Sequence, residues 1–125
     1  FGGKEEAEEL QQLANDFPCA KVVNADGLET ELTLMRQLKV MVSLDSANMH
    51  LAVLCGVPVV SVWGGTHPAA GFGPLGGNDK YIQQIALPCR PCSVYGRADC
   101  PLGTLACLEG VSAEQVWGVV RGVAG

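Results

Sequence analysis

Two apolar runs on either side of a small polar cluster constrain the fold of this 125-residue chain more than any other feature. The first run, residues 40–44 (VMVSL), alternates little, which suggests a strand buried on both faces. Residues 46–55 fit a short helix, which Gly56 would end and Pro58 would keep from continuing. The second run, residues 57–63 (VPVVSVW), is the next strand. Strand, helix and strand in this order predict parallel pairing with a right-handed crossover.

The rest of the chain continues this alternation. Apolar spacing predicts helices over residues 4–17 and 28–38, separated by a strand at 21–24 and the turn pair Asp26–Gly27. A Gly-rich loop at 64–77 precedes a strand at 81–87, an irregular Cys- and Pro-rich segment at 87–108, and a last helix that opens with the capping box Ser112 and Gln115. The prediction is an α/β fold, a Rossmann-like parallel sheet flanked by helices, whose small or aromatic core residues include Cys19, Cys55, Trp63 and Trp117.

Composition limits the partners. Hydrophobic residues make up 48% of the chain and charged residues 17%, as in globular proteins. The net charge of −5 argues against a nucleic-acid partner and requires local donors for any anionic ligand. No apolar run reaches the roughly 18 residues that suggest a membrane span, and the acidic start shows no signal peptide. The opening FGG reads as the end of a strand, so we expect a fragment of a longer chain that lacks at least one strand.

The polar cluster lies where ligands bind in open parallel sheets, beyond the carboxyl ends of the strands. Asp45 ends one strand, and the loop at 64–67 ends the next. Free N–H groups of Ser46, Ala47 and Asn48 at the helix start would suit a phosphate. The alternative is an ordinary N-cap at Ser46, with Asp45 stabilising the helix start and His50 as a hydrogen-bonded, half-buried residue. No G-x-G-x-x-G motif directly follows a strand and no P-loop motif is present, which argues against a dehydrogenase or a P-loop enzyme.

Four of the six cysteines lie in the segment at 87–108 and leave three interpretations open. Cys89, Cys92, Cys100 and Cys107 could hold zinc, form disulfides or remain free thiols. Their spacing does not match the familiar zinc patterns, so we predict no metal site. The cations Lys80, Arg90 and Arg97 are interpreted as solvated surface charges rather than phosphate ligands.

Several motifs together resemble one family. They are Asp45-Ser-Ala-Asn-Met-His50, Gly56-Val-Pro58, Gly64-Gly-Thr-His-Pro68 and the tail from Leu87. The combination resembles the C-terminal half of the glycosyltransferases that include the lipopolysaccharide heptosyltransferases, with their D-[ST]-G-x-x-H and G-P-T-D-P-like motifs. The chain departs from that pattern at three positions: Ala47 replaces a Gly, and Gly65 and His67 replace a Pro and an Asp.

The resemblance implies a two-domain GT-B enzyme of which residues 1–125 are most of the domain that binds the nucleotide-sugar donor, typically ADP-heptose. Such enzymes are inverting and need no metal or cofactor. By position, Asp45 would contact the sugar hydroxyls, and the amides of Ser46, Ala47 and Asn48 would face the diphosphate. The remaining donor-binding residues would be His50, Thr66 and, at the ribose, Glu6, with Glu5 as the alternative register. Glu6 also has an ordinary explanation, since acids are favoured in a first helical turn.

The resemblance further implies that the other domain binds a lipopolysaccharide core or lipid A acceptor and carries the base, so this fragment alone should be inactive. The location would be cytoplasmic, or peripheral at the inner membrane, with no transmembrane segment. Two other classes stay open: a non-catalytic binding or scaffold domain held by a Cys-rich metal knot, and another GT-B enzyme such as a nucleotide-sugar epimerase.

Overall fold

The computed structural model describes residues 1–23, 27–76, 79–84 and 86–125. The chain divides into two compact units, Phe1–Leu34 and Met35–Gly125. The first unit contains helices, and the second contains the sheet and the polar cluster that the sequence singled out.

The first unit begins with a 3-10 turn, Lys4–Glu6, that runs into helix α1, Ala7–Asp16. Helix α2, Leu28–Met35, ends at the first residue of the second unit. The predicted strand at 21–24 is wrong for residues 21–23, which have no regular structure, while Asn24 and Asp26 lie outside the described residues. A strand of three or four residues needs a hydrogen-bonded neighbour to persist, and sequence propensity supplies none.

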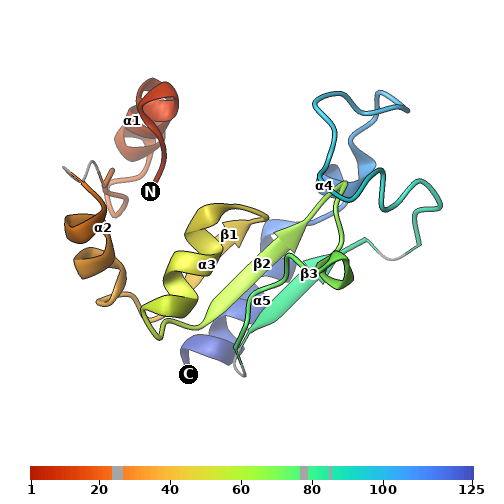
Figure 1. Cartoon of the computed structure of the whole chain (residues 1–125). Coiled ribbons are helices and arrows are strands. Elements are labelled where there is room, and N and C mark those ends of the chain that lie inside the picture. Colours follow the sequence, from red (N-terminus) through yellow and green to blue (C-terminus); the bar gives the residue numbers. More distant parts are fainter. Residues whose placement is uncertain (24–26, 77–78, 85) are drawn as a thin grey trace. The chain divides into compact units, whose positions relative to one another are not determined.

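The second unit is built on a three-stranded parallel sheet with the order β1–β2–β3. Its strands are β1, Met41–Leu44; β2, Val59–Trp63; and β3, Lys80–Gln83. Because all three are parallel, their carboxyl ends lie at the same end of the sheet (Figure 1). The predicted strand–helix–strand unit is confirmed, and β3 is shorter than the predicted 81–87, of which Ile85 lies outside the described residues.

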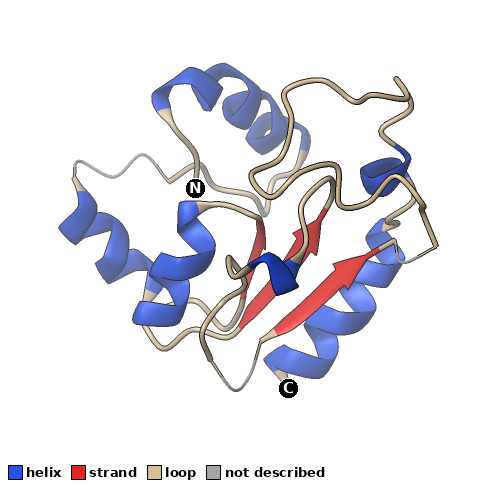
Figure 2. Cartoon of the chain, turned by 45° about the vertical axis from the view of Figure 1, so that its right-hand side comes forward, coloured by secondary structure: helices blue, strands red, loops and turns tan. Residues whose placement is uncertain are grey.

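Helices α3, Ala47–Leu54, and α5, Ala113–Ala124, cover opposite faces of the sheet (Figures 1 and 2). Every residue of the central strand β2 is therefore buried, and the core includes Met49 and Ala52 of α3 and Val120 of α5. Trp63 is fully buried as predicted, and its indole N–H donates to the Ser61 hydroxyl at 2.8 Å. This bond gives the indole N–H a partner in the core, where it would otherwise have none.

Helix α3 begins and ends as the sequence predicts. Ser46 is its N-cap residue and Cys55 its C-cap, and Gly56 follows with the positive φ of 75° that favours glycine at this position. The capping box of α5 is also confirmed: the Gln115 N–H donates to the Ser112 hydroxyl at 3.2 Å, and the Ser112 N–H donates to the Gln115 side chain at 2.8 Å.

Three predictions about burial are wrong. In β1, Val42 is 46% exposed and Leu44 57% exposed, because they lie on the face of the strand opposite Met41, where α5 packs mainly on β2 and β3. Cys19 is exposed, in the turn after α1. Trp117 is 59% exposed, because it lies beside the buried stripe of α5 and not on it.

Candidate functional site

A cleft of about 240 Å³ lies at the carboxyl ends of β1 and β2. We call it the strand-end cleft. Three stretches of chain line it: the end of β1, the end of β2 with its following loop, and part of the Cys-rich segment, residues 87–108. The lining residues are Leu44, Asp45, Val62, Gly64, Gly65, Thr66, Tyr95, Gly96, Arg97 and Leu108.

Two predicted site residues, Asp45 and Thr66, meet in this cleft. Asp45 is exposed and immediately precedes the N-cap of α3, whereas Thr66 is almost buried at 8% exposure. The parallel pairing of β1 with β2, with Leu44 opposite Val62, brings the loops that follow these strands to the same end of the sheet. The topology therefore places a carboxylate and a hydroxyl on one small cavity, as the motif spacing predicts.

The start of α3 is not closed by its own side chains. The N-cap Ser46 makes no side-chain cap hydrogen bond. Its hydroxyl lies 2.9 Å from that of Ser43, which donates its own hydrogen to the Leu44 carbonyl at 2.8 Å. Since a hydroxyl has one hydrogen, Ser46 must be the donor to Ser43. Ser46 is therefore the N-cap residue, as the alternative predicts, but without the side-chain bond of an ordinary N-cap, and the first N–H groups of α3 keep their capacity for an anion.

Ala47 and Asn48 are the first residues of α3, with Ala47 exposed and Asn48 partly exposed. Among the described residues, the single non-glycine residue with positive φ is Leu105, so Ala47 replaces the family's glycine without backbone strain. His50 lies one turn further along α3, is partly exposed, and has no side-chain hydrogen bond within the described residues. None of these three residues lines the strand-end cleft.

Glu6 belongs to the first unit, where its carboxylate accepts a hydrogen bond from the Gly3 N–H at 2.8 Å. That bond, together with the position of Glu6 at a helix start, gives it a local capping role. The geometry therefore supports the ordinary explanation for this acid, and its predicted ribose contact stays a prediction.

The Cys-rich segment is joined to the loop after β2 by direct contacts. The Cys92 N–H donates to the Gly65 carbonyl at 2.7 Å. A Cβ added to Gly96 would lie 3.4 Å from the Thr66 methyl, and one added to Gly64 would lie 2.9 Å from the Leu108 side chain. Figures 1 and 2 show this segment looping beyond the arrowheads of the strands. It thus forms one wall of the strand-end cleft.

Arg90 holds this wall in place by hydrogen bonds, so its interpretation as a solvated surface charge is wrong. Its guanidinium donates to five partly buried oxygens and bridges β2, its loop and the end of β3. The acceptors are the carbonyls of Trp63, Gly64, Thr66 and Gln84 and the side-chain oxygen of Gln83. The sequence gives no sign of this role, because four of these five acceptors are backbone atoms, which carry no side-chain signature.

Arg97 lies seven residues further along the same segment but is exposed, and within the described residues its guanidinium has no hydrogen bond or ion pair. Its neighbour Tyr95 is held in place by a tilted contact with Phe72, at 5.7 Å between ring centroids. From the sequence, Arg97 is interpreted as a solvated charge and Tyr95 is not a candidate, because their place on the cleft depends on how an irregular segment folds back.

None of the cysteines forms a disulfide, and no three metal-ligating side chains come together in the described part of the chain. Cys89, Cys92 and Cys100 are partly exposed and Cys107 is buried. The N–H groups of Leu105 and Leu102, followed by those of two neighbouring residues in the same turn, lower the pKa of the Cys100 thiol. The metal-knot alternative therefore has no support from this arrangement.

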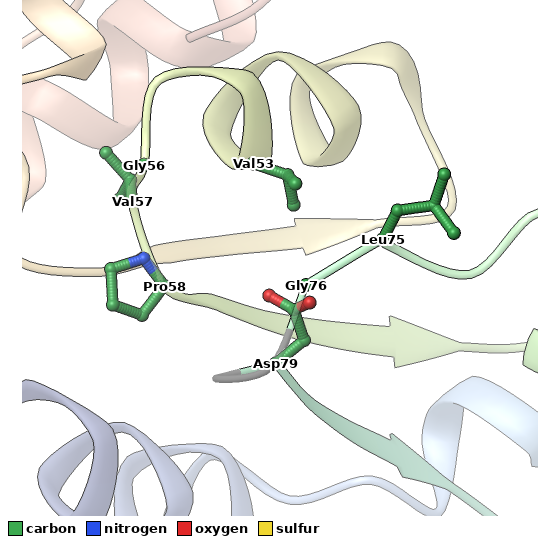
Figure 3. Close-up of a pocket in the computed structure, with 7 residues that line it drawn as sticks. All are labelled: Val53, Gly56, Val57, Pro58, Leu75, Gly76 and Asp79. Carbon is green, nitrogen blue, oxygen red and sulfur yellow. The ribbon is translucent and has the colours of Figure 1, made fainter.

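A second hollow lies at the opposite end of the sheet, near the amino ends of β2 and β3 (Figure 3). Pro58 and Asp79 immediately precede these strands, and the Asp79 carboxylate is drawn facing the cavity. One of its oxygens is buried without a hydrogen-bond partner. None of the predicted site residues lines this hollow, so it is separate from the strand-end cleft.

The described part of the chain is therefore an α/β protein with a Rossmann-like parallel sheet and a cleft at the carboxyl ends of its strands. The family model of glycosyltransferase family 9 (heptosyltransferase) matches residues 1–101, so the chain belongs to this family of glycosyltransferases. Comparisons with curated proteins and with solved structures gave no significant match. Among the described residues, no helix is long and apolar enough to cross a membrane.

Proposed function

We propose that this chain is the donor-binding domain of a GT-B glycosyltransferase that transfers heptose, or a related sugar, from a nucleotide diphosphate to a lipopolysaccharide core acceptor. The observation that carries the proposal is the open start of α3 beside a cleft that also holds the Asp45 carboxylate and the Thr66 hydroxyl. Membership of the heptosyltransferase family supports the sugar-transfer chemistry. A cytoplasmic or inner-membrane-peripheral location and ADP-heptose as donor belong to the same proposal.

The two ends of the site suit the two parts of such a donor. N–H groups at a helix start stabilise negative charge, which fits the diphosphate. A carboxylate accepts hydrogen bonds from hydroxyl groups, so Asp45 suits the sugar. During transfer the acceptor hydroxyl gives its proton to the base expected in the other domain while its oxygen bonds to the anomeric carbon. The bond from that carbon to the diphosphate breaks with its electron pair leaving on the phosphate oxygen. Donors aimed at that oxygen stabilise the charge that develops there.

The test is calorimetry of the chain with ADP-heptose, ADP and UDP, for the native sequence and for Asp45→Ala. If Asp45 binds the sugar, ADP-heptose affinity should fall about tenfold or more, which is about 1.4 kcal/mol. ADP affinity should stay unchanged or rise, because the substitution removes a negative charge near the diphosphate. Asp16→Ala, at the end of α1, is the matched loss of an acid and should change neither affinity.

Other outcomes would contradict parts of the proposal. Binding of UDP but not ADP would point to another GT-B enzyme, such as a nucleotide-sugar epimerase. Equal losses for ADP and ADP-heptose would remove Asp45 from the sugar end of the site. No binding of any nucleotide by the native chain would overturn the donor-domain function.

A further inference from the structure

The strand-end cleft is lined by two opposite charges, one on each wall. Asp45 and Arg97 both line it, yet no ion pair joins them within the described residues. Asp45 comes from the end of β1, and Arg97 comes from the Cys-rich segment on the other wall. The cavity thus presents an acceptor of hydroxyl hydrogens and a donor to anions, each with its charge available to a ligand.

Arg97 is the basic side chain best placed for an anion in the second unit. Arg36 and Lys39 precede β1 and Lys80 begins β3, at the amino ends of the strands and away from the cleft, and Arg121 lies in the last turn of α5. Arg90 is close, but its guanidinium is occupied by protein oxygens. Among the residues that line the cleft, Arg97 is the one cation.

We propose that Arg97 binds the donor's diphosphate where it extends from the start of α3 into the strand-end cleft, a role that rests on the function proposed above. A guanidinium presents paired N–H donors that match two phosphate oxygens, and charge-assisted bonds of this kind are stronger than neutral ones. The chain carries a net charge of −5, so a diphosphate gains little from the overall field and depends on such a local cation. The cavity of about 240 Å³ is smaller than typical sites for whole drug-sized ligands, which suits part of the donor.

The position of Arg97 is fixed by the fold of its own segment. The Ser93 hydroxyl donates to the Gly96 carbonyl at 2.6 Å, and Gly96 has the positive φ of 83° that turns the chain next to Thr66. The Tyr95 ring contacts Phe72 on the other side of this turn. Arg97 therefore projects from a hydrogen-bonded turn, which limits the backbone entropy lost when it binds a phosphate.

The experiment compares Arg97→Met and Arg97→Lys with the native chain in titrations with ADP, inorganic pyrophosphate and adenosine. Arg97→Met should weaken ADP and pyrophosphate about tenfold or more and leave adenosine unchanged, since adenosine has no phosphate. Arg97→Lys should recover part of the loss, because it keeps the charge without the paired donors. Arg121→Met is the matched control and should change none of the three affinities. Melting curves check that each variant is folded.

The outcomes separate this inference from the proposed function. If the native chain binds ADP-heptose and ADP, and Arg97→Met binds both equally well, the role of Arg97 is wrong and the donor function stands. If pyrophosphate binds in an Arg97-dependent way but ADP-heptose and ADP bind no better, the anion site stands and the donor function is wrong. If the native chain binds neither pyrophosphate nor any nucleotide, both are overturned.

Discussion

Removal of the Arg90 guanidinium should destabilise the second unit strongly. In Arg90→Met, the five oxygens that accept from Arg90 lose their donor. The shorter contacts are to the carbonyls of Gly64, Gln84 at 2.8 Å and Thr66 at 2.9 Å, while that to Trp63 is 3.3 Å. Trp63 and Thr66 are buried residues, so their carbonyls are the hardest for water to reach.

The magnitude follows from those contacts. Hydrogen bonds to a charged group contribute about 1.5–3 kcal/mol each, and a stranded buried acceptor costs about 1–3 kcal/mol. The bonds share one side chain and are not additive, and water can replace some at the partly exposed acceptors. A loss of about 3–4 kcal/mol is expected, which is large against a total stability of about 5–15 kcal/mol.

Urea unfolding followed by tryptophan fluorescence measures this loss, because the fully buried Trp63 reports on the second unit. With a slope of about 1.5–2 kcal/mol per M, the midpoint should fall by about 2 M. Arg97→Met removes the same group from an exposed position in the same segment and should leave the midpoint unchanged. Arg90→Lys should recover less than half of the loss, since an ammonium cannot span the same set of acceptors. A shift below about 0.5 M for Arg90→Met would refute the reasoning.

Two further predictions concern the core and the thiols. Met49→Ala, at a fully buried position of α3, should lower the free energy of unfolding in urea by about 2–5 kcal/mol. Leu54→Ala, in the same helix but 80% exposed, should change it by less than about 0.5 kcal/mol. Equal losses of stability in the two variants would contradict the observed buried face of α3. Because backbone N–H groups lower the pKa of Cys100, its alkylation should reach half its maximal rate at a lower pH in the folded chain than in urea, as followed by mass spectrometry. The depressed pKa also means that this thiolate adds stability at pH values above the unfolded pKa, and the contribution is lost as the pH falls through the folded pKa. An identical pH profile in urea would show that the turn around Cys100 does not stabilise the thiolate.

The strand–helix–strand unit could be predicted because its signals are local. The apolar runs, the end of α3 at Gly56 and the capping box at Ser112 each depend on residues within a few positions of one another. The exposure of Trp117 could also have been found: Val116, Val120 and Val123 lie at helical spacing, and Trp117 is beside that stripe. The prediction instead used residue type, which says little about a large aromatic on an amphipathic helix.

The unpredicted part of the site depends on contacts between distant residues. Arg90 bonds to carbonyls 24 to 27 positions earlier in the chain, and any residue type could supply those oxygens. Similarly, Tyr95 and Arg97 reach the strand-end cleft because an irregular segment folds back over the end of β2. Motif spacing located Asp45 and Thr66 correctly on one cleft because both follow parallel strands directly, where sheet geometry leaves little freedom.

The two arginines of the Cys-rich segment have different roles in one wall of the strand-end cleft. Arg90 uses its donors on protein oxygens and so fixes the distance between the segment and the loop after β2. In its proposed role Arg97 keeps its donors for the diphosphate, and it projects from the same wall that Arg90 holds. Arg90→Met should therefore lower both the unfolding midpoint and the affinity for ADP, while Arg97→Met lowers the affinity alone. A variant that lost stability at position 90 yet kept full ADP affinity would show that the cleft does not need the wall that Arg90 holds.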